Sequence, residues 1–147
     1  MTKEKFKSPI VVAPDVGGVR RARNFASLLN APLAVIEKHR HTHLRDSLEV
    51  LSMTGEVVGD CAVIIDDIIS TGGTIIESAK ALKQKGAKKV IVCATHGVFA
   101  SDALEKIERS EIDKVFITDS INITKKSKKV EIVSVSELIA DSLVGEL

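Results

Sequence analysis

One stretch decides the predicted fold, and it reads Val63-Ile64-Ile65-Asp66-Asp67-Ile68-Ile69-Ser70-Thr71-Gly72-Gly73-Thr74. Its unbroken β-branched start is typical of a strand buried on both faces of a parallel sheet. The carboxylates of Asp66 and Asp67 follow where we expect this strand to leave the sheet. A glycine turn comes next, and helical periodicity runs from Ile75 to Lys85. The stretch therefore predicts a strand, a polar loop and a helix in direct succession.

The polar loop has the chemistry of a sugar-phosphate site. Glycines allow the backbone to approach an anion closely, and a helix start presents unpaired N–H groups with a favourable dipole. The hydroxyl groups of Ser70, Thr71 and Thr74 add donors. The acidic pair suits sugar hydroxyls or a hydrated magnesium ion. Ligands of open α/β sheets bind at the carboxyl ends of the strands, where this loop would lie. The alternative, a capped helix with no ligand, needs neither both acids nor both glycines.

The stretch also resembles the phosphoribosyl diphosphate (PRPP) motif of type I phosphoribosyltransferases and PRPP synthetases. That motif consists of a hydrophobic strand, two acids and then Thr-Gly-Gly-Thr, as at 71–74 here. A P-loop or a Gly-x-Gly-x-x-Gly fold fits less well, because neither sequence occurs. The resemblance implies that Asp66 and Asp67 hold the 2- and 3-hydroxyls of ribose. It also implies a 5-phosphate site made by Ser70, Thr71, Gly72, Gly73 and Thr74.

A second strand–turn–helix unit lies near the start of the chain, around the turn Pro14-Asp15-Val16-Gly17-Gly18. Gly17 and Gly18 could open backbone amides to a diphosphate, and Asp15 could hold magnesium through its carboxylate. Together with the arginines at 20–23, the turn looks like the pyrophosphate-binding loop of PRPP synthetases. The alternative is a plain strand-to-helix turn with solvated arginines.

Two cations, Lys38 and Arg40, follow an expected strand at 33–36. PRPP synthetases have a matching Lys-x-Arg at the root of a flexible catalytic loop, although His39 departs from the arginine that is common between them. The resemblance implies that this pair is catalytic and stabilises the transferring phosphoryl group, as two cations near a phosphate chain can. We therefore expect a mobile catalytic loop region at 38–54. A basic loop facing water is the alternative.

Three histidines, His39, His41 and His43, alternate in this region and would share one face of an extended segment. No Cys or paired carboxylate nearby completes a metal site. We therefore assign them to the mobile loop, with their role left open.

The remaining pattern alternates strands with helices. Strands are expected at 10–13, 89–94, 115–118 and 132–135, helices at 19–29, 75–84, 103–107 and from 136, and a strand or short helix at 48–53. This alternation predicts an α/β fold, a mainly parallel sheet flanked by helices, and the resemblance makes it type I phosphoribosyltransferase-like. We expect one domain over 1–147, with a ragged lead-in at 1–8.

Composition narrows the possible partners and compartment. The 147 residues include 44% hydrophobic residues, enough for one core, and 21 Lys and Arg balance 20 Asp and Glu. That balance predicts no nucleic-acid and no membrane partner, and 3% aromatics argue against base-stacking platforms. Cys61 and Cys93 lie in strand patterns and read as buried thiols of a reducing compartment. With no signal peptide or span visible, we expect a cytoplasmic protein.

The resemblance extends from Ile10 to Leu143 and is to the C-terminal half of PRPP synthetases. It implies transfer of diphosphate from ATP to ribose 5-phosphate, with Mg²⁺ as cofactor and a homo-oligomeric assembly. In that family the adenine site comes from an N-terminal domain and a neighbouring subunit, so ATP would bind with a partner half. This chain has few aromatics for an adenine slot, since Phe25 and Phe116 fall on core-facing positions.

Two other functions stay open. A stand-alone phosphoribosyltransferase would use the same loops to present PRPP to a base, but the chain has no hood segment with an aromatic residue. A non-catalytic, synthetase-like binding subunit is the other. The absent half favours it, whereas intact Lys38, Arg40, Asp66 and Asp67 speak against it.

Overall fold

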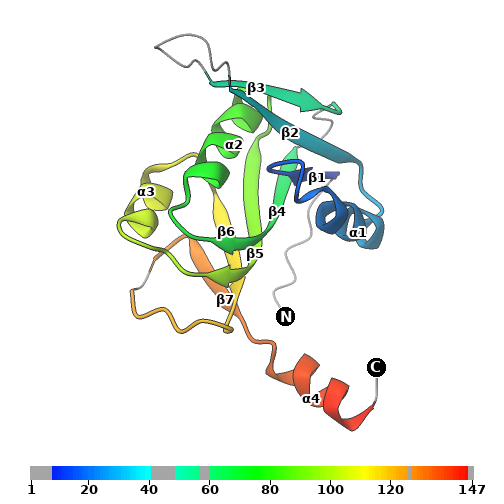
Figure 1. The fold of residues 1–147 in the computed structure, drawn as a ribbon, viewed down its shortest axis with the longest axis vertical. Helices are drawn as coiled ribbons and strands as arrows, with labels where there is room; N and C mark the ends of the chain where they lie inside the picture. The colour runs from blue at the N-terminus through cyan, green and yellow to red at the C-terminus, as the bar shows by residue number, and fades with distance from the viewer. Residues whose placement is uncertain (1–7, 41–48, 57–59, 126, 146–147) are drawn as a thin grey trace.

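Seven strands form one sheet in the part of the chain that the structure describes, residues 8–40, 49–56, 60–125 and 127–145 of a computed structural model (Figure 1). The strand order is β3-β2-β1-β4-β5-β6-β7. The strands are Pro9–Ala13 (β1), Leu33–Arg40 (β2), Glu49–Thr54 (β3), Cys61–Ile69 (β4), Lys89–Gly97 (β5), Lys114–Thr118 (β6) and Val130–Val133 (β7). All neighbours are parallel except β2 and β3, which pair antiparallel.

The central strands are buried on both faces. Along β1, Ile10 and Val12 join one apolar cluster, while Val11 between them joins the other. All three side chains are fully shielded from solvent. These strands therefore read as unbroken apolar runs, because a parallel sheet covered on both faces has no polar side.

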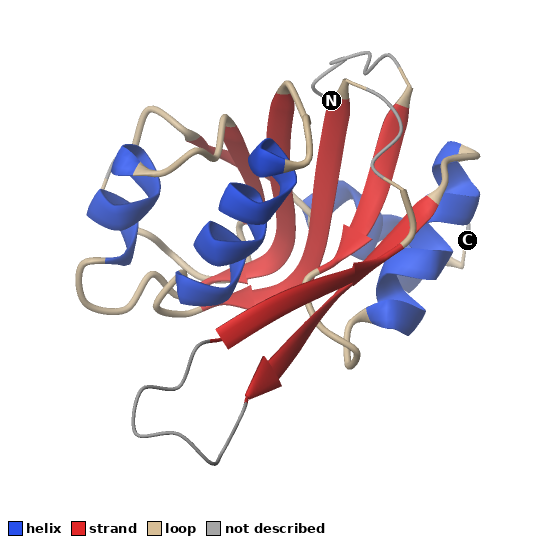
Figure 2. Cartoon of the chain, turned by 90° about the horizontal axis from the view of Figure 1, so that it is seen from above, coloured by secondary structure: helices blue, strands red, loops and turns tan. Residues whose placement is uncertain are grey.

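Helices α2 (Gly73–Gln84) and α3 (Ala103–Arg109) cover one face of the sheet, and α1 (Val19–Leu29) lies on the other, as Figure 2 shows. From α2 the side chains of Ile75, Ala79 and Leu82 enter the core. They are spaced by three and four residues, so they form one apolar stripe along the helix. The sequence pattern of this helix thus already specifies which side packs on the sheet.

The α1 face is only partly covered by the described helices. α1 packs over β1, β2 and β4. Beside it, on β5 and β6, lies an open groove of about 390 Å³ lined largely by apolar atoms. Phe25, Phe116 and Cys93 line this groove and are half-buried. Phe25 and Phe116 pack against the apolar cluster on this face, as their core-facing positions predicted, and they stay partly exposed at the groove.

Helix α4 (Ser136–Val144) follows β7 and extends away from the sheet at the lower end of Figure 1. None of its residues is buried, and Leu138 and Leu143 are 56% and 82% exposed. Among the described residues, no helix has both the length and the apolar character needed to cross a membrane.

The fold class predicted from the sequence is confirmed, with differences in the extent of several strands. β7 covers Val130–Val133, where a strand at 132–135 was expected. β4 continues through Asp66 and Asp67 to Ile69, because its backbone keeps pairing with β5 as far as Gly97. The expected loop region 38–54 is strand at both ends: β2 runs to Arg40, and its antiparallel partner β3 begins at Glu49. Residues 41–48, with His41 and His43, and the lead-in at 1–7 lie outside the described residues, and the mobility of the loop stays a prediction.

Candidate functional site

The candidate site begins at the end of β4 and continues into the start of α2. Three residues, Ser70 to Gly72, connect the two elements. Gly72 has φ +78° and ψ −5°, a left-handed conformation that side chains other than glycine rarely adopt. This sharp turn lets α2 start immediately at Gly73, so the N–H groups of its first turn lie beside the strand end.

These elements enclose a pocket of about 120 Å³, lined by Asp66 and residues 68–75. Every residue expected to hold a 5-phosphate lines it: Ser70, Thr71, Gly72, Gly73 and Thr74. At Gly73 an added Cβ would meet only Thr71 Oγ1, at 3.9 Å, so the space above this glycine is open. The pocket joins hydroxyl donors to a helix N-terminus, which is the arrangement that binds phosphate groups.

The acidic pair at the edge of this pocket is electrostatically unequal. Asp66 has a side chain only 16% exposed, while that of Asp67 is 57% exposed. Burial raises the pKa of Asp66 from 3.8 to about 6, and the nearby carboxylates of Asp67 and Asp15 add to the rise. The pKa of Asp67 is lowered, first by its hydrogen bond with Asp66 and also by Arg21. The pair therefore shares one proton more readily than two separate carboxylates would.

The predicted diphosphate turn lies at the start of α1. Asp15 Oδ1 accepts a hydrogen bond from the Gly18 N–H at 2.8 Å, which closes the turn around Gly17. Asp15 is exposed, and its charge reaches Asp66, so the two loops meet at one end of the sheet. A single carboxylate can bind Mg²⁺ when phosphate and water oxygens supply the other ligands, which is the usual arrangement for magnesium bound with phosphates. No group of three metal-ligating side chains occurs in the described part of the chain.

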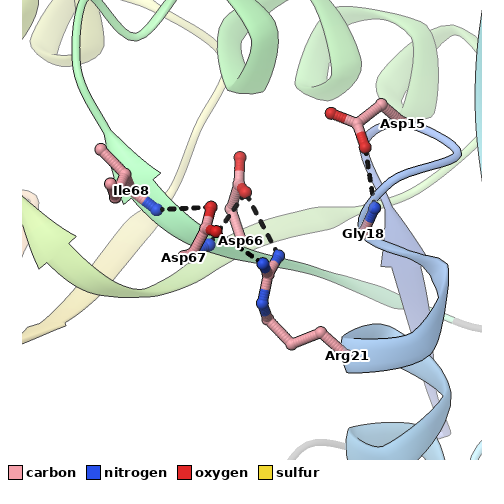
Figure 3. A network of polar contacts seen from close by, with 6 residues as sticks. All are labelled: Asp15, Gly18, Arg21, Asp66, Asp67 and Ile68. Atoms are coloured by element: carbon pink, nitrogen blue, oxygen red, sulfur yellow. Dashed lines mark hydrogen bonds and ion pairs between the residues drawn. The ribbon is translucent and has the colours of Figure 1, made fainter.

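Arg21 is a site residue that the sequence reasoning did not select. From α1 it donates to Asp67 Oδ2 at 2.7 Å and to Asp66 Oδ1 at 3.5 Å (Figure 3). The available signal was its place one helical turn after Gly18, at the same end of the sheet as the acidic pair. Without the fold, that signal does not separate Arg21 from the solvated arginines on either side.

Lys38 and Arg40 lie at the end of β2, where it pairs with the start of β3. Their backbone partners in β3 are Leu51 and Glu49. The structure describes the backbone of these positions and of His39, and their side chains lie outside the described part. Their expected catalytic role therefore stays a prediction.

His96, at the end of β5, is tied to the neighbouring strand end. Its Nδ1 lies 2.8 Å from Ser120 Oγ, a hydrogen-bond distance. Thr118 Oγ1 donates to the Thr95 carbonyl at 2.8 Å beside it. These contacts fit a structural role for this histidine.

Comparison with known proteins finds a family model and curated relatives that agree with each other. Residues 43–145 match the family model described as phosphoribosyl synthetase-associated domain. A ribose-phosphate pyrophosphokinase from Thermotoga maritima is 47% identical over 135 residues, which are 92% of this chain and 42% of that protein. The chain thus spans less than half the length of this relative.

Solved structures give the same result. Phosphoribosylpyrophosphate synthetase from Mycobacterium smegmatis superposes with a TM-score of 0.84 at 32% identity, covering 95% of this chain and 45% of that one. Orotate phosphoribosyltransferase from Aeropyrum pernix superposes with a TM-score of 0.55 at 22% identity, covering 95% of this chain and 67% of that one. The second likeness shows a shared fold alone, the type I phosphoribosyltransferase fold.

Proposed function

The chain belongs to the phosphoribosyl synthetase family, being homologous to part of the ribose-phosphate pyrophosphokinases, and on that premise we propose that it is the sugar-phosphate half of such an enzyme. The reaction transfers the β,γ-diphosphoryl group of ATP to ribose 5-phosphate. The anomeric hydroxyl oxygen bonds to the β-phosphorus and loses its proton. The bond from that phosphorus to the α–β bridging oxygen breaks, and AMP leaves.

One observation carries this proposal: Asp66 and the residues from Ser70 to Thr74 line a single pocket at a helix N-terminus. The 5-phosphate lies against the N–H and hydroxyl donors, where the helix dipole favours an anion. The ribose 2- and 3-hydroxyls donate to the carboxylates of Asp66 and Asp67. The anomeric carbon is then directed toward the Asp15–Gly18 turn, where the diphosphate is received.

The turn from Asp15 to Gly18 binds the diphosphate through backbone N–H groups. Asp15 would hold magnesium, which would neutralise charge on the phosphate chain. Lys38 and Arg40 stabilise the negative charge that develops on the transferring group. These cations matter most at the transition state, since the diphosphate of the bound substrate already has the turn from Asp15 to Gly18.

ATP binds with a partner that supplies the adenine site, either a domain like the other half of the synthetases or another copy in a homo-oligomer. The chain spans 42% of the Thermotoga maritima relative, and a second half would fit the remaining length. In the described part of the chain neither Cys61 nor Cys93 is in a disulfide, which fits work in the reducing cytoplasm. Burial raises the pKa of Cys93 to about 12, so it stays a neutral thiol there.

Calorimetric titration with ribose 5-phosphate tests the pocket. Thr74→Val removes a hydrogen-bond donor, and Gly73→Val fills the space that the phosphate needs. A side chain at Gly73 would cause no clash within the protein, so the second variant should still fold. Losing a hydrogen bond to a charged group costs about 1.5–3 kcal/mol, so each variant should bind roughly 10- to 100-fold more weakly.

The matched control is Thr124→Val, which removes an exposed threonine hydroxyl from the connection after β6. Its affinity for ribose 5-phosphate should equal that of the unmodified chain. Unchanged affinity in both pocket variants would remove this loop from the proposed site.

A further inference from the structure

The guanidinium group of Arg21 lies between the two loops of the proposed site (Figure 3). On one side it donates to Asp67 Oδ2 at 2.7 Å and to Asp66 Oδ1 at 3.5 Å. On the other side, its Nη1 is 3.7 Å from the place where a Cβ on Gly18 would lie. Gly18 belongs to the turn proposed to receive the diphosphate. The guanidinium group can therefore reach both the proposed sugar position and the proposed diphosphate position by rotation of the Arg21 side chain.

Arg21 is paired with the carboxylate of Asp67, to which the proposed sugar hydroxyls would donate. Asp67 Oδ2 accepts from Arg21, and Asp67 Oδ1 accepts from the Ile68 N–H at 3.0 Å. A ribose hydroxyl that binds Asp67 must share or displace one of these donors. The Ile68 donor is part of β4 and fixed, whereas Arg21 is a long side chain that is 37% exposed. Arg21 is thus the donor that can leave.

We propose that Arg21 is a positioning residue that changes its anionic partner and so couples the two halves of the site. With no ligand it pairs with Asp67. With a diphosphate in the Asp15–Gly18 turn it turns to that anion, and Asp67 becomes available to the ribose hydroxyls. This inference rests on the proposed function, and it adds a residue and a coupling that the function does not require.

The charges favour this exchange. An arginine–carboxylate pair as exposed as this one contributes little, because water screens both partners. A diphosphate offers several oxygens of higher charge, which the planar guanidinium can bind in a forked geometry. The exchange also reduces repulsion between the diphosphate and the acidic pair, since the cation stays between them. Because linkage is reciprocal, bound sugar should in turn favour diphosphate binding.

The test uses calorimetry with two probes, ribose 5-phosphate and inorganic diphosphate with Mg²⁺. In the unmodified chain, saturating diphosphate should tighten ribose 5-phosphate binding by about fivefold or more, the lower end of ordinary coupling between sites. Arg21→Gln should bind diphosphate more weakly but ribose 5-phosphate equally or more tightly when alone. The coupling should fall to none or become unfavourable. A merely structural role would weaken both ligands together.

Two further variants sharpen the result. Arg109→Gln removes the same charge from an exposed position at the end of α3, on the opposite face of the sheet from α1, and should leave both affinities and the coupling unchanged. Arg21→Lys keeps the charge without the fork and should retain part of the coupling. If circular dichroism shows that Arg21→Gln is unfolded, Arg21→Lys replaces it as the test of the coupling.

The outcomes separate this inference from the function on which it rests. If ribose 5-phosphate fails to bind the unmodified chain, the proposed function fails, and the coupling fails with it. If both ligands bind but the coupling is absent, or is the same without Arg21, only the role of Arg21 is overturned. If the sugar binds but diphosphate does not, the proposed diphosphate turn is overturned together with the role of Arg21.

Discussion

At the scale of single residues, Asp66 lies where its negative charge is unfavourable. Its side chain is mostly buried at the end of β4, and two other carboxylates, Asp67 and Asp15, act on it. If the residue at this position had only a structural role, a neutral side chain would make the fold more stable. Keeping a carboxylate here costs stability, which is typical of sites arranged for a ligand.

Asp66→Asn should therefore stabilise the ligand-free chain at pH 7 to 8. Because the pKa of Asp66 rises from 3.8 to about 6 in the fold, the folded chain keeps a proton that the unfolded chain loses between these values. The contribution of this group to stability is thus complete below pH 3.8 and is lost as the pH rises to about 6. Asparagine does not titrate, so the Asp66→Asn variant keeps its stability as the pH rises. Its Tm should exceed that of the unmodified chain by near zero at pH 4 and by a few degrees at neutral pH.

Asp67→Asn is the matched comparison for thermal melts at both pH values. The pKa of Asp67 is lowered, so its charge is favourable in the fold, and its removal should lower Tm slightly at pH 7. The account of Asp66 is contradicted if the difference between Asp66→Asn and the unmodified chain is the same at pH 4 and pH 7.

At the scale of elements, the β4–loop–α2 unit could be predicted from sequence because each of its signals is local. The β-branched run marks the strand, Gly72 marks the turn, and the apolar stripe starting at Ile75 marks the helix. The length of β4 past Asp66 could not be predicted in this way. Asp66 pairs with Ala94 and Ile69 with Gly97, and such pairing depends on a strand that is distant in sequence.

The β2–β3 pair and the Arg21 contact had no comparable local signal. Residues from Glu37 to Arg40 are all polar or charged, so periodicity predicts a loop there. The strand forms because β3 supplies antiparallel backbone partners from Thr54 to Glu49. Arg21 and Asp67 are 46 residues apart in sequence, and only the parallel order of β1 and β4 brings their ends together.

Lys38→Ala should separate catalysis from binding at the end of β2. The proposed 5-phosphate pocket lies on β4 and α2, so affinity for ribose 5-phosphate should change by less than about twofold. The rate of AMP release should fall by on the order of 100-fold, as when a group that stabilises transition-state charge is removed. The rate is measured in whichever assembly of the chain gives turnover. Lys80→Ala, an exposed lysine of α2, is the control. Equal loss of rate and affinity would argue against a transition-state role.

At the scale of the whole molecule, the chain has the proposed sugar-phosphate site on its sheet and an open apolar groove beside α1. The groove and the exposed apolar side chains of α4 are surfaces that a partner could cover. Phosphate contacts alone hold ATP loosely, because in-line transfer needs the nucleotide fixed in position.

The chain alone should therefore form PRPP poorly. The measurement is AMP release from ATP that depends on ribose 5-phosphate and magnesium, with purified protein and no added partner. We expect a rate well below roughly one per second, the ordinary range for an enzyme. A rate at or above that value would show that copies of this chain rebuild a nucleotide pocket by themselves.

Deletion of residues 136–147 should leave the fold intact. No side chain of α4 is buried, so its removal takes little from the core, and Tm should change by less than about 2 °C. Leu82→Ala is the contrasting variant, because this fully buried side chain of α2 should cost about 2–5 kcal/mol. A large fall in Tm on deletion would mean that α4 packs on the sheet in solution.

The groove on β5 and β6 also determines how the stability of the chain changes with temperature. Phe25, Phe116 and Cys93 are already partly hydrated in the folded chain, so unfolding exposes less new apolar surface there than under a covering helix. The heat-capacity increment of unfolding should therefore fall below the usual value of about 12–15 cal/mol/K per residue. The curve of unfolding free energy against temperature becomes flatter as a result. A partner that covers the groove would restore the missing heat capacity and steepen that curve.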